Sequence, residues 1–195
     1  MSFSVIAIII FLFTGCGNNQ KPAALENETL EKAQPTGEEM IQRGEYLVNL
    51  GGCHDCHSTK KMGPAGPELV MERMLSGHPS DEPVPKFSPS MIKAGIVMFN
   101  SGLTASAGMW GISFSANLTP DQTGIGNWPE ENFIRALKQG KYKGLEGSRT
   151  LLPPMPWQNF ANVTEDDIKA MFAYFKSIKP VSNAVPLPIP LEKMK

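Results

Sequence analysis

The sequence is poor in cysteine and in net charge, and segments that alternate apolar and polar residues are scarce. Its three cysteines cannot all pair, which excludes a fold built on several disulfides. The formal net charge is -1, with 18 Lys and Arg against 19 Asp and Glu, and this argues against a nucleic-acid-binding domain, whose basic surface would raise the isoelectric point. Because strand patterns are scarce, the expected fold class is all-α.

Glycine and proline, by contrast, are abundant. The chain has 18 glycines and 17 prolines among 195 residues, which stays below the roughly 25–30% of Gly and Pro that marks low-complexity, disordered chains. The length suits one domain. We therefore expect a single compact domain with long ordered loops and no internal repeat.

The N-terminal segment is uncharged and almost wholly apolar as far as Phe13. It is shorter than the roughly 20 residues that a membrane-spanning helix needs, and it matches the hydrophobic core of an export signal. Phe13-Thr14-Gly15-Cys16 resembles a bacterial lipobox, in which cleavage leaves Cys16 lipidated at the new N-terminus. We expect a lipoprotein-type export signal over residues 1–15, with an ordinary cleaved signal or an uncleaved anchor as alternatives. Each places the mature chain outside the cytoplasm, on the periplasmic side of a bacterial membrane.

Residues 16–37 are polar and acidic without an apolar period, which is typical of a flexible tether. The domain is expected over residues 38–182, with an extended Pro-rich tail over 183–195. Residues 58–126 have many breakers and no convincing long apolar period, so they are expected to form a loop-rich insertion. Apolar spacing, caps and breakers predict helices over Glu38–Leu50, from an Asn127 cap with Pro129 in the first turn to Gly140, and from a Thr164 cap to Pro180, with short ones near Pro67–Leu75 and Pro89–Phe99.

Cys53-His54-Asp55-Cys56-His57 matches C-x-x-C-H, the attachment sequence of c-type haem. The spacing suits the chemistry, because two thiols three positions apart reach the two vinyl groups of a porphyrin and the adjacent His57 then lies under the iron. Covalent attachment follows export, so the signal segment and the motif support each other. The alternatives are a thioredoxin-type pair, a structural zinc site and a Cys53–Cys56 disulfide. A thioredoxin-type pair lacks its βαβ surround here, and a zinc site lacks a full ligand set.

The sixth ligand of the iron has several candidates, because the chain has 11 methionines and a third histidine, His78. Met155 stands apart because Pro156 keeps it out of the helical region and neighbouring prolines stiffen the chain. The pattern predicts a stiff, extended loop that presents one thioether. The alternatives are Met98, Met109, His78 and an open coordination position.

Other residues are candidates for supporting contacts. Arg149 is a candidate donor to a haem propionate, and the indole N–H of Trp157 is another. The carbonyl of Pro64 or Pro67 is expected to accept a hydrogen bond from the ring of the proximal histidine. Asn117 is expected to hold its own loop through its side chain. Five basic residues lie between positions 135 and 149, and they form either a docking face for an acidic redox partner or a solvated helix edge. They are Arg135, Lys138, Lys141, Lys143 and Arg149.

Three motifs follow one another in order: Cys53 to His57, Asn117-Leu118-Thr119-Pro120-Asp121 with Gly124-Ile125-Gly126-Asn127-Trp128, and Pro153-Pro154-Met155-Pro156-Trp157. Together they resemble the bacterial single-haem cytochrome c family, and the haem c domains of membrane dehydrogenase cytochrome subunits. The resemblance implies an all-α cytochrome c fold whose first and last helices pack near the haem. It also implies thioether bonds at Cys53 and Cys56, His57 as the proximal ligand and Met155 as the distal one. Subunits of this kind usually carry several haem motifs, whereas this chain has one.

The sequence thus predicts one covalent haem c with its iron, His/Met axial ligation, and electron transfer by an exported, lipid-anchored cytochrome c that is not an enzyme. The expected partners are redox proteins and, through the lipid anchor, a membrane; neither nucleic acid nor a small-molecule substrate is expected. Two alternatives remain. One is a haem enzyme or gas sensor with an open distal site, and the other is an electron-transfer subunit of a membrane dehydrogenase or oxidase complex.

Overall fold

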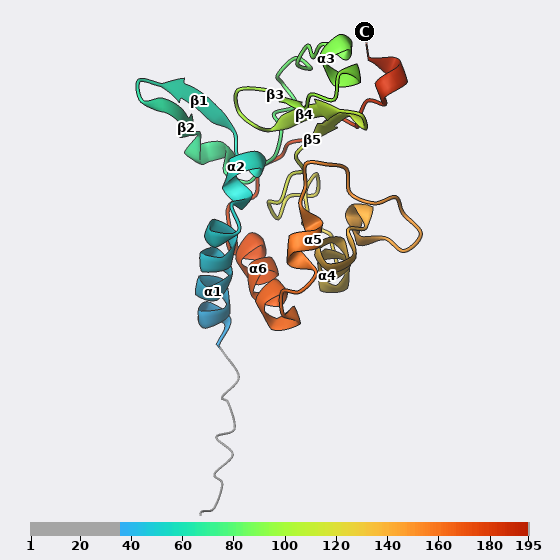
Figure 1. Cartoon of the computed structure of the whole chain (residues 1–195). Helices are drawn as coiled ribbons and strands as arrows, with labels where there is room; N and C mark the ends of the chain where they lie inside the picture. The colour runs from blue at the N-terminus through green and yellow to red at the C-terminus, as the bar shows by residue number, and fades with distance from the viewer. Residues whose placement is uncertain (1–35, 195) are drawn as a thin grey trace, which may run out of the picture. The chain divides into compact units, whose positions relative to one another are not determined.

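The computed structural model describes residues 36–194, which belong to one compact unit (Figure 1). The expected export signal over residues 1–15, the lipidation site Cys16 and nearly all of the expected tether lie outside the described residues. The α-helices are α1 (Gly37–Leu50), α2 (Cys53–His57), α3 (Pro89–Lys93), α4 (Glu130–Gln139), α5 (Trp157–Phe160) and α6 (Glu165–Ser177). The strands are β1 (Lys60–Gly63), β2 (Gly66–Leu69), β3 (Met98–Phe99), β4 (Ala105–Gly108) and β5 (Gly111–Phe114).

Helix α1 begins where its sequence supplies a capping box. The Thr36 hydroxyl accepts from the Glu39 backbone N–H at 3.2 Å, and the Glu39 carboxylate accepts from the Thr36 backbone N–H at 2.7 Å. These reciprocal bonds satisfy donors that the first turn of a helix leaves free. The helix expected over Glu38–Leu50 is therefore present, with its boundary one residue earlier.

Helices α1 and α6 lie side by side and share the most extensive contact between any two elements of the described chain (Figure 1). The two helices approach closely at Gly44, where a side chain would collide with the carbonyl oxygen of Ala170. At the start of α6 the Thr164 hydroxyl accepts from the Asp167 backbone N–H at 3.2 Å, as expected for a cap, and an Arg43–Asp167 ion pair at 2.9 Å links the two helices. The absence of a side chain at Gly44 thus sets how near these helices come.

Helix α4 begins differently from the prediction. Its N-cap is Pro129, whose side chain makes no capping hydrogen bond, and Asn127 lies outside the helix. The expected cap at Asn127 is wrong because Ile125–Trp128 forms its own turn, closed by the Trp128 N–H to the Ile125 carbonyl at 3.0 Å. The helix ends at Gly140 as expected, in the left-handed conformation with φ 63° that glycine adopts at little cost.

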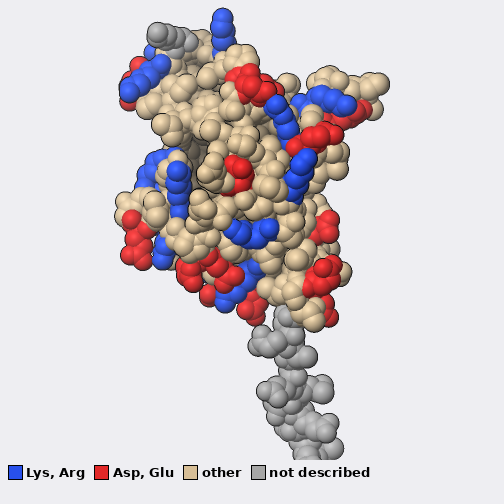
Figure 2. Space-filling view, turned by 180° about the vertical axis from the view of Figure 1, so that it is seen from behind, with Lys and Arg blue, Asp and Glu red and all other residues tan. Residues whose placement is uncertain are grey.

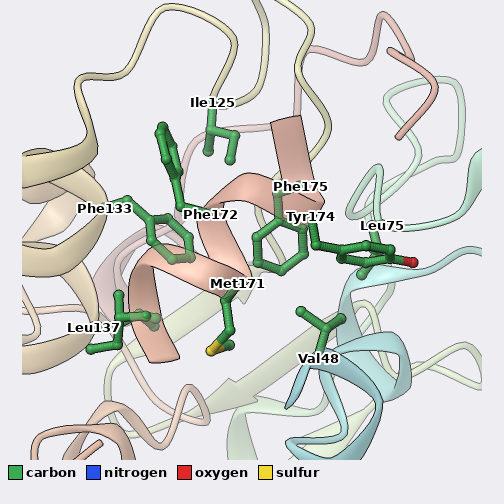
Figure 3. Close-up of a cluster of buried hydrophobic side chains, with 10 residues drawn as sticks. Val48, Leu75, Ile125, Phe133, Leu137, Met171, Phe172, Tyr174 and Phe175 are labelled. Carbon is green, nitrogen blue, oxygen red and sulfur yellow. The ribbon is translucent and has the colours of Figure 1, made fainter. Parts of the chain in front are cut away.

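The main hydrophobic core lies between α1, α4 and α6 (Figure 3). Phe175 and Val48 are almost fully buried there, and the Phe133 ring packs against Phe172 and Phe175 with centroids 5.3 and 5.6 Å apart. Half-buried apolar side chains border this cluster, among them Cys53, Leu118, Trp128, Met155 and Phe160. The Cys53 motif and the Met155 loop, which lie far apart in the sequence, therefore pack against the same core cluster.

The all-α fold class expected from the sequence is wrong, because the described chain is mixed: 38% is helix and 13% is strand. β1 and β2 form an antiparallel hairpin, and β3, β4 and β5 form a three-stranded antiparallel sheet in that order. In Figure 1 the hairpin projects beside α2, and the sheet lies above the helical body next to α3. A second core cluster packs against this sheet and contains Phe87, Ile92, Ala105, Ala107 and Ile112.

The insertion over 58–126 contains most of this unexpected structure. In place of a helix near Pro67–Leu75, the chain forms β2 and a 3-10 turn over Met71–Arg73. The short helix expected near Pro89–Phe99 is present as α3, capped by the Ser88 hydroxyl, but it ends at Lys93 and β3 follows. Left-handed glycines such as Gly95 (φ 86°) end these short elements, and the insertion is ordered by sheet pairing as well as by loops.

The Pro-rich residues after α6 pack on the domain. Ile189 pairs with Ile112 at the edge of β5, with N–H to carbonyl bonds of 2.7 and 3.0 Å in the two directions. Gly111 allows this approach, because a side chain there would collide with the Ile189 carbonyl. Leu191 and Met194 then join the second core cluster. Within residues 36–194, no helix combines the length and the hydrophobicity that crossing a bilayer requires.

Candidate functional site

The C-x-x-C-H motif forms its own short helix, α2, which begins after the left-handed Gly52 (φ 64°). Both thiols of the motif, Cys53 and Cys56, are free. Burial raises the pKa of the Cys53 thiol to about 11 and raises that of Cys56 as well. Thiol–disulfide exchange and zinc binding both need the thiolate, which reactive cysteines stabilise through a lowered pKa. The environment of these two cysteines therefore favours neither of those alternatives.

His57 is fixed by one hydrogen bond from its ring. Its Nδ1 lies 2.8 Å from the carbonyl oxygen of Ala116. Because a carbonyl can only accept, Nδ1 must carry the proton, which leaves the lone pair of Nε2 available as a ligand. Burial lowers the pKa of His57, and this favours the neutral imidazole that metals bind.

The acceptor for His57 corrects the sequence prediction. Pro64 and Pro67 lie in the β1–β2 hairpin, and the carbonyl that accepts belongs to Ala116, 59 residues along the chain from His57. The prediction failed because it placed the acceptor shortly after the motif. The acceptor acts through its backbone, so its residue type carries no signal of this role, although Ala116 directly precedes the Asn117-Leu118-Thr119-Pro120-Asp121 motif.

Asn117 holds its own loop, as predicted. Its side-chain oxygen accepts from the Thr119 N–H at 2.9 Å and from the Thr119 hydroxyl at 2.7 Å. Its amide nitrogen donates to the Val181 carbonyl at 2.8 Å. The buried Asn117 thus ties the loop that carries the Ala116 carbonyl to the segment after α6.

The Lys60 side chain binds backbone carbonyls at the C-terminal end of α2. Its ammonium donates to the carbonyls of Asp55 at 2.6 Å, Gly102 at 3.0 Å and Ser58 at 3.2 Å, with the His54 carbonyl at 3.4 Å. Helices this short leave their last carbonyls without partners, and a cation there is favoured by the helix dipole. Burial lowers the pKa of Lys60. This role was not predicted, because Gly102 lies between β3 and β4 and reaches the motif only through the fold of the insertion.

Met155 is half-buried in an extended turn and packs on the border of the main core, as Cys53 does. Helix α5, which follows the Met155 loop, approaches the motif at Gly51, where an added Cβ would lie 3.4 Å from the Phe160 ring and 3.7 Å from the Cys53 Sγ. The alternative ligands lie elsewhere: Met98 packs on the second core cluster, Met109 is 64% exposed, and His78 is buried with Nδ1 2.9 Å from the Thr104 hydroxyl. Among the candidates, Met155 is the one that borders the same cluster as the motif.

Arg149 and Trp157 make contacts of their own. The exposed Arg149 guanidinium lies 4.0 Å from the centre of the Tyr142 ring and donates to the Thr150 carbonyl at 2.9 Å. Trp157 opens α5 and packs on Gly140, where a side chain would collide with the indole ring. The observed role of Trp157 is therefore to join the Met155 loop to the end of α4.

The basic segment over 135–149 uses much of its charge within the chain. Arg135 donates to the Gly144 carbonyl at 2.6 Å, and Lys138 donates to the Val163 carbonyl at 3.1 Å. The face in Figure 2 carries both signs of charge, with a broad uncharged area between them. These contacts favour the solvated helix edge over a dedicated acidic-partner docking face.

The residues present fit a covalently held haem. Two neutral thiols, a histidine with a free Nε2, and a border of half-buried apolar side chains supply the attachment points, the ligand and the apolar surround that such a group needs. Within the described chain, no group of three or more His, Cys, Asp or Glu side chains could hold a metal ion. A haem iron does not need such a group, because the porphyrin would supply most of its ligands.

Comparisons with known proteins agree with the motif. The sequence matches no family model. It is 33% identical over 152 residues to the cytochrome c subunit of alcohol dehydrogenase (quinone) from Gluconobacter oxydans (strain 621H), which covers 77% of this chain and 24% of that protein. It is 31% identical over 147 residues to the gluconate 2-dehydrogenase cytochrome c subunit of Pantoea cypripedii, which covers 74% of this chain and 25% of that protein. The fructose dehydrogenase cytochrome subunit of Gluconobacter japonicus is 30% identical over 155 residues, which is 77% of this chain and 24% of that protein.

These similarities confirm the resemblance to the cytochrome c family. More narrowly, the chain is related to the cytochrome c subunits of dehydrogenases, and it spans about a quarter of the length of those relatives. The relatives are named as cytochrome subunits, which supports the prediction that this chain is not itself an enzyme.

Proposed function

We propose that the chain transfers electrons through one c-type haem, attached at Cys53 and Cys56, with His57 as proximal ligand and Met155 as distal ligand. The observation that carries this proposal is the His57 ring on the motif helix, whose Nδ1 proton is held by the Ala116 carbonyl at 2.8 Å. That bond sets the tautomer in which Nε2 is a ligand. Cys53 and Met155 both pack at the border of the main core, and this supports Met155 as the distal ligand.

Each residue has a distinct task in this proposal. A haem bound here supplies an iron that gains and loses one electron. The Ala116 carbonyl draws on the Nδ1 proton, which makes the imidazole of His57 a stronger electron donor. Met155 offers a soft thioether that favours the reduced state and so raises the reduction potential. Apolar side chains along the border, Leu118 and Trp128 among them, exclude water and close the site to substrates.

The test of this proposal separates a closed carrier from an open haem site. The protein is matured with its haem, reduced, and exposed to carbon monoxide while its absorption spectrum is followed. A six-coordinate iron held by two protein ligands leaves the spectrum unchanged at neutral pH. Rapid binding of carbon monoxide, together with a high-spin oxidised spectrum, would instead identify an open site and the enzyme or sensor alternative.

A dehydrogenase is the proposed redox partner. The relatives that support this idea are named as cytochrome subunits of alcohol, gluconate and fructose dehydrogenases, and the chain matches only about a quarter of each. The experiment is affinity purification of the tagged protein from detergent-solubilised membranes, followed by a test of whether the co-purified enzyme reduces the haem when its substrate is added. Recovery of the cytochrome alone, with no substrate-driven reduction by the membrane extract, would contradict this partner.

We also propose export and lipid anchoring at Cys16, which rests on the lipobox-like Phe13-Thr14-Gly15-Cys16 sequence. Cells that express the full chain are labelled with a fatty acid analogue, and Cys16→Ser is the matched variant. The account predicts a labelled, membrane-bound protein that loses both label and membrane attachment in Cys16→Ser. Equal labelling of the two proteins would contradict it.

A further inference from the structure

Asn183, in the segment after α6, makes an unusually complete set of side-chain bonds. Its amide nitrogen donates to the Ser76 carbonyl at 2.6 Å and to the His78 carbonyl at 2.9 Å, and its side-chain oxygen accepts from the Ser80 N–H at 2.8 Å. A carboxamide has two N–H donors, so both are used here. With 8% of Asn183 exposed, these buried bonds fix the backbone on both sides of Gly77.

Gly77, between those two carbonyls, contacts His57 directly. Its N–H donates to the His57 backbone carbonyl at 2.7 Å. Its φ of 80° lies in the left-handed region that glycine adopts freely. An added Cβ would lie 2.7 Å from the Ala116 oxygen and would collide with the Ser115 oxygen. The Gly77 backbone therefore packs against the very peptide whose carbonyl accepts from the His57 ring.

The same loop also fixes the position of that peptide. The His78 N–H donates to the Ser115 carbonyl at 3.0 Å, one residue before Ala116. On the other side of Ala116, the Asn117 amide donates to the Val181 carbonyl at 2.8 Å and to the Asn183 carbonyl at 3.4 Å. Ser115 and Asn117, on either side of Ala116, are thus both held by hydrogen bonds to the loop around Gly77 or to the segment that contains Asn183.

We propose that Asn183 is a positioning residue for the proximal histidine. It holds Gly77 against the His57 backbone and, through the same loop, holds the Ala116 carbonyl against the His57 ring. This inference rests on the proposed function, in which His57 is the proximal ligand. Loss of Asn183 loosens the Nδ1–H to carbonyl bond, so the imidazole donates less charge to the iron and the oxidised state is less stabilised. The reduction potential then rises.

The test uses the mature haem protein and the variants Asn183→Asp and Asn183→Ser. Asp keeps the shape and the acceptor oxygen of Asn183 but removes both donors. The matched control is Asn162→Ala, since Asn162 is exposed at the surface. The midpoint potential is measured by redox titration, and exchange of the His57 Nδ1 proton with D₂O is followed by NMR. We expect a higher potential and faster exchange in both Asn183 variants, and no change in the control.

The measurements on the Asn183 variants distinguish a positioning role from a purely structural one. A lower melting temperature with unchanged potential and exchange rate would show a merely structural role and overturn the inference. Should neither variant fold, the wild type still serves: the His57 ring proton, the Gly77 amide and the Asn183 side-chain amide should then exchange at similar rates. A ring proton that exchanges far faster than the Asn183 amide overturns the inference. A wild-type protein without covalent haem would instead contradict the proposed function, so the two failures are distinguishable.

Discussion

The His57 ring donates from Nδ1 to the carbonyl oxygen of Ala116 at 2.8 Å, although the two residues are 59 positions apart in the sequence. The acceptor lies just beyond β5, within the insertion over 58–126. The strands and turns of that insertion therefore serve the motif helix, because they bring a carbonyl to the histidine and a second carbonyl, that of Gly102, to Lys60.

Met155→Ala should remove the distal ligand. The weak near-infrared absorption band of the oxidised protein, which arises from sulfur-to-iron charge transfer, should disappear, and the midpoint potential should fall because the thioether favours ferrous iron. The control is Met109→Ala, at a position 64% exposed, which should keep both the band and the potential. Persistence of the band in Met155→Ala would assign the distal ligand elsewhere.

Gly44→Ala should destabilise the pair of helices α1 and α6. An added Cβ collides with the Ala170 carbonyl, and overpacking of this kind costs about 1–3 kcal/mol of the free energy of unfolding. The matched control is Gly37→Ala, where nothing lies within 4 Å of the added Cβ. Guanidinium unfolding of the two variants measures the difference, and equal midpoints would contradict the close helix crossing.

Lys60→Met should loosen the C-terminal end of the motif helix. The substitution leaves the carbonyls of Asp55, Ser58 and Gly102 without their charged donor, and lost bonds to a charged group cost about 1–3 kcal/mol in stability. Lys61→Met, at the adjacent exposed position, should cost far less. The free energy of unfolding by denaturant compares the two. A Lys61→Met protein as unstable as Lys60→Met would refute a specific role for the Lys60 ammonium.

His78 should make stability depend on pH. It is fully buried, Nε2 has no hydrogen-bond partner among the described residues, and burial lowers its pKa below the usual value. As pH falls below about 6.5, the unfolded chain therefore binds a proton that the folded chain refuses. The free energy of unfolding is full above that pH and declines below it, by at most about 1.4 kcal/mol per pH unit for one group.

The variant that tests this is His78→Gln, which removes the titrating ring and keeps a side chain able to bond Thr104. Urea unfolding at pH 7 and pH 5 should show a smaller loss of stability in His78→Gln than in the wild type. Since His54 is also half-buried with a lowered pKa, some loss should remain. Identical losses in both proteins would show that His78 contributes nothing to the pH dependence.

Local patterns in the sequence predicted the parts of the fold that local interactions determine. The apolar spacing over 38–50 marked α1, the cap Thr164 marked the start of α6, and Gly140 marked the end of α4, whereas the Thr36–Glu39 capping box was not predicted. The short helix α2 over the C-x-x-C-H motif was not predicted. Asn127 was not a cap because a neighbouring turn competed for it.

The sheets and the supporting groups of the site depend on distant contacts, which no local pattern reveals. Strand β4, Ala105–Gly108, is buried on both faces and built from small residues, so it lacks the alternation that identifies a strand. The acceptor Ala116 acts through its backbone, which carries no residue-specific signal. Asn183 lies in a Pro-rich stretch that resembled an extended tail, yet its side chain bonds to residues more than 100 positions earlier.

We expect a single haem to be bound covalently to Cys53 and Cys56. The most direct measurement of this attachment is intact-protein mass spectrometry of the exported protein under denaturing conditions, with thiol alkylation and with Cys56→Ser as the matched variant. The account predicts the mass of the chain plus one haem, with neither motif cysteine alkylated. A chain without added tetrapyrrole, alkylated at both Cys53 and Cys56, would contradict it.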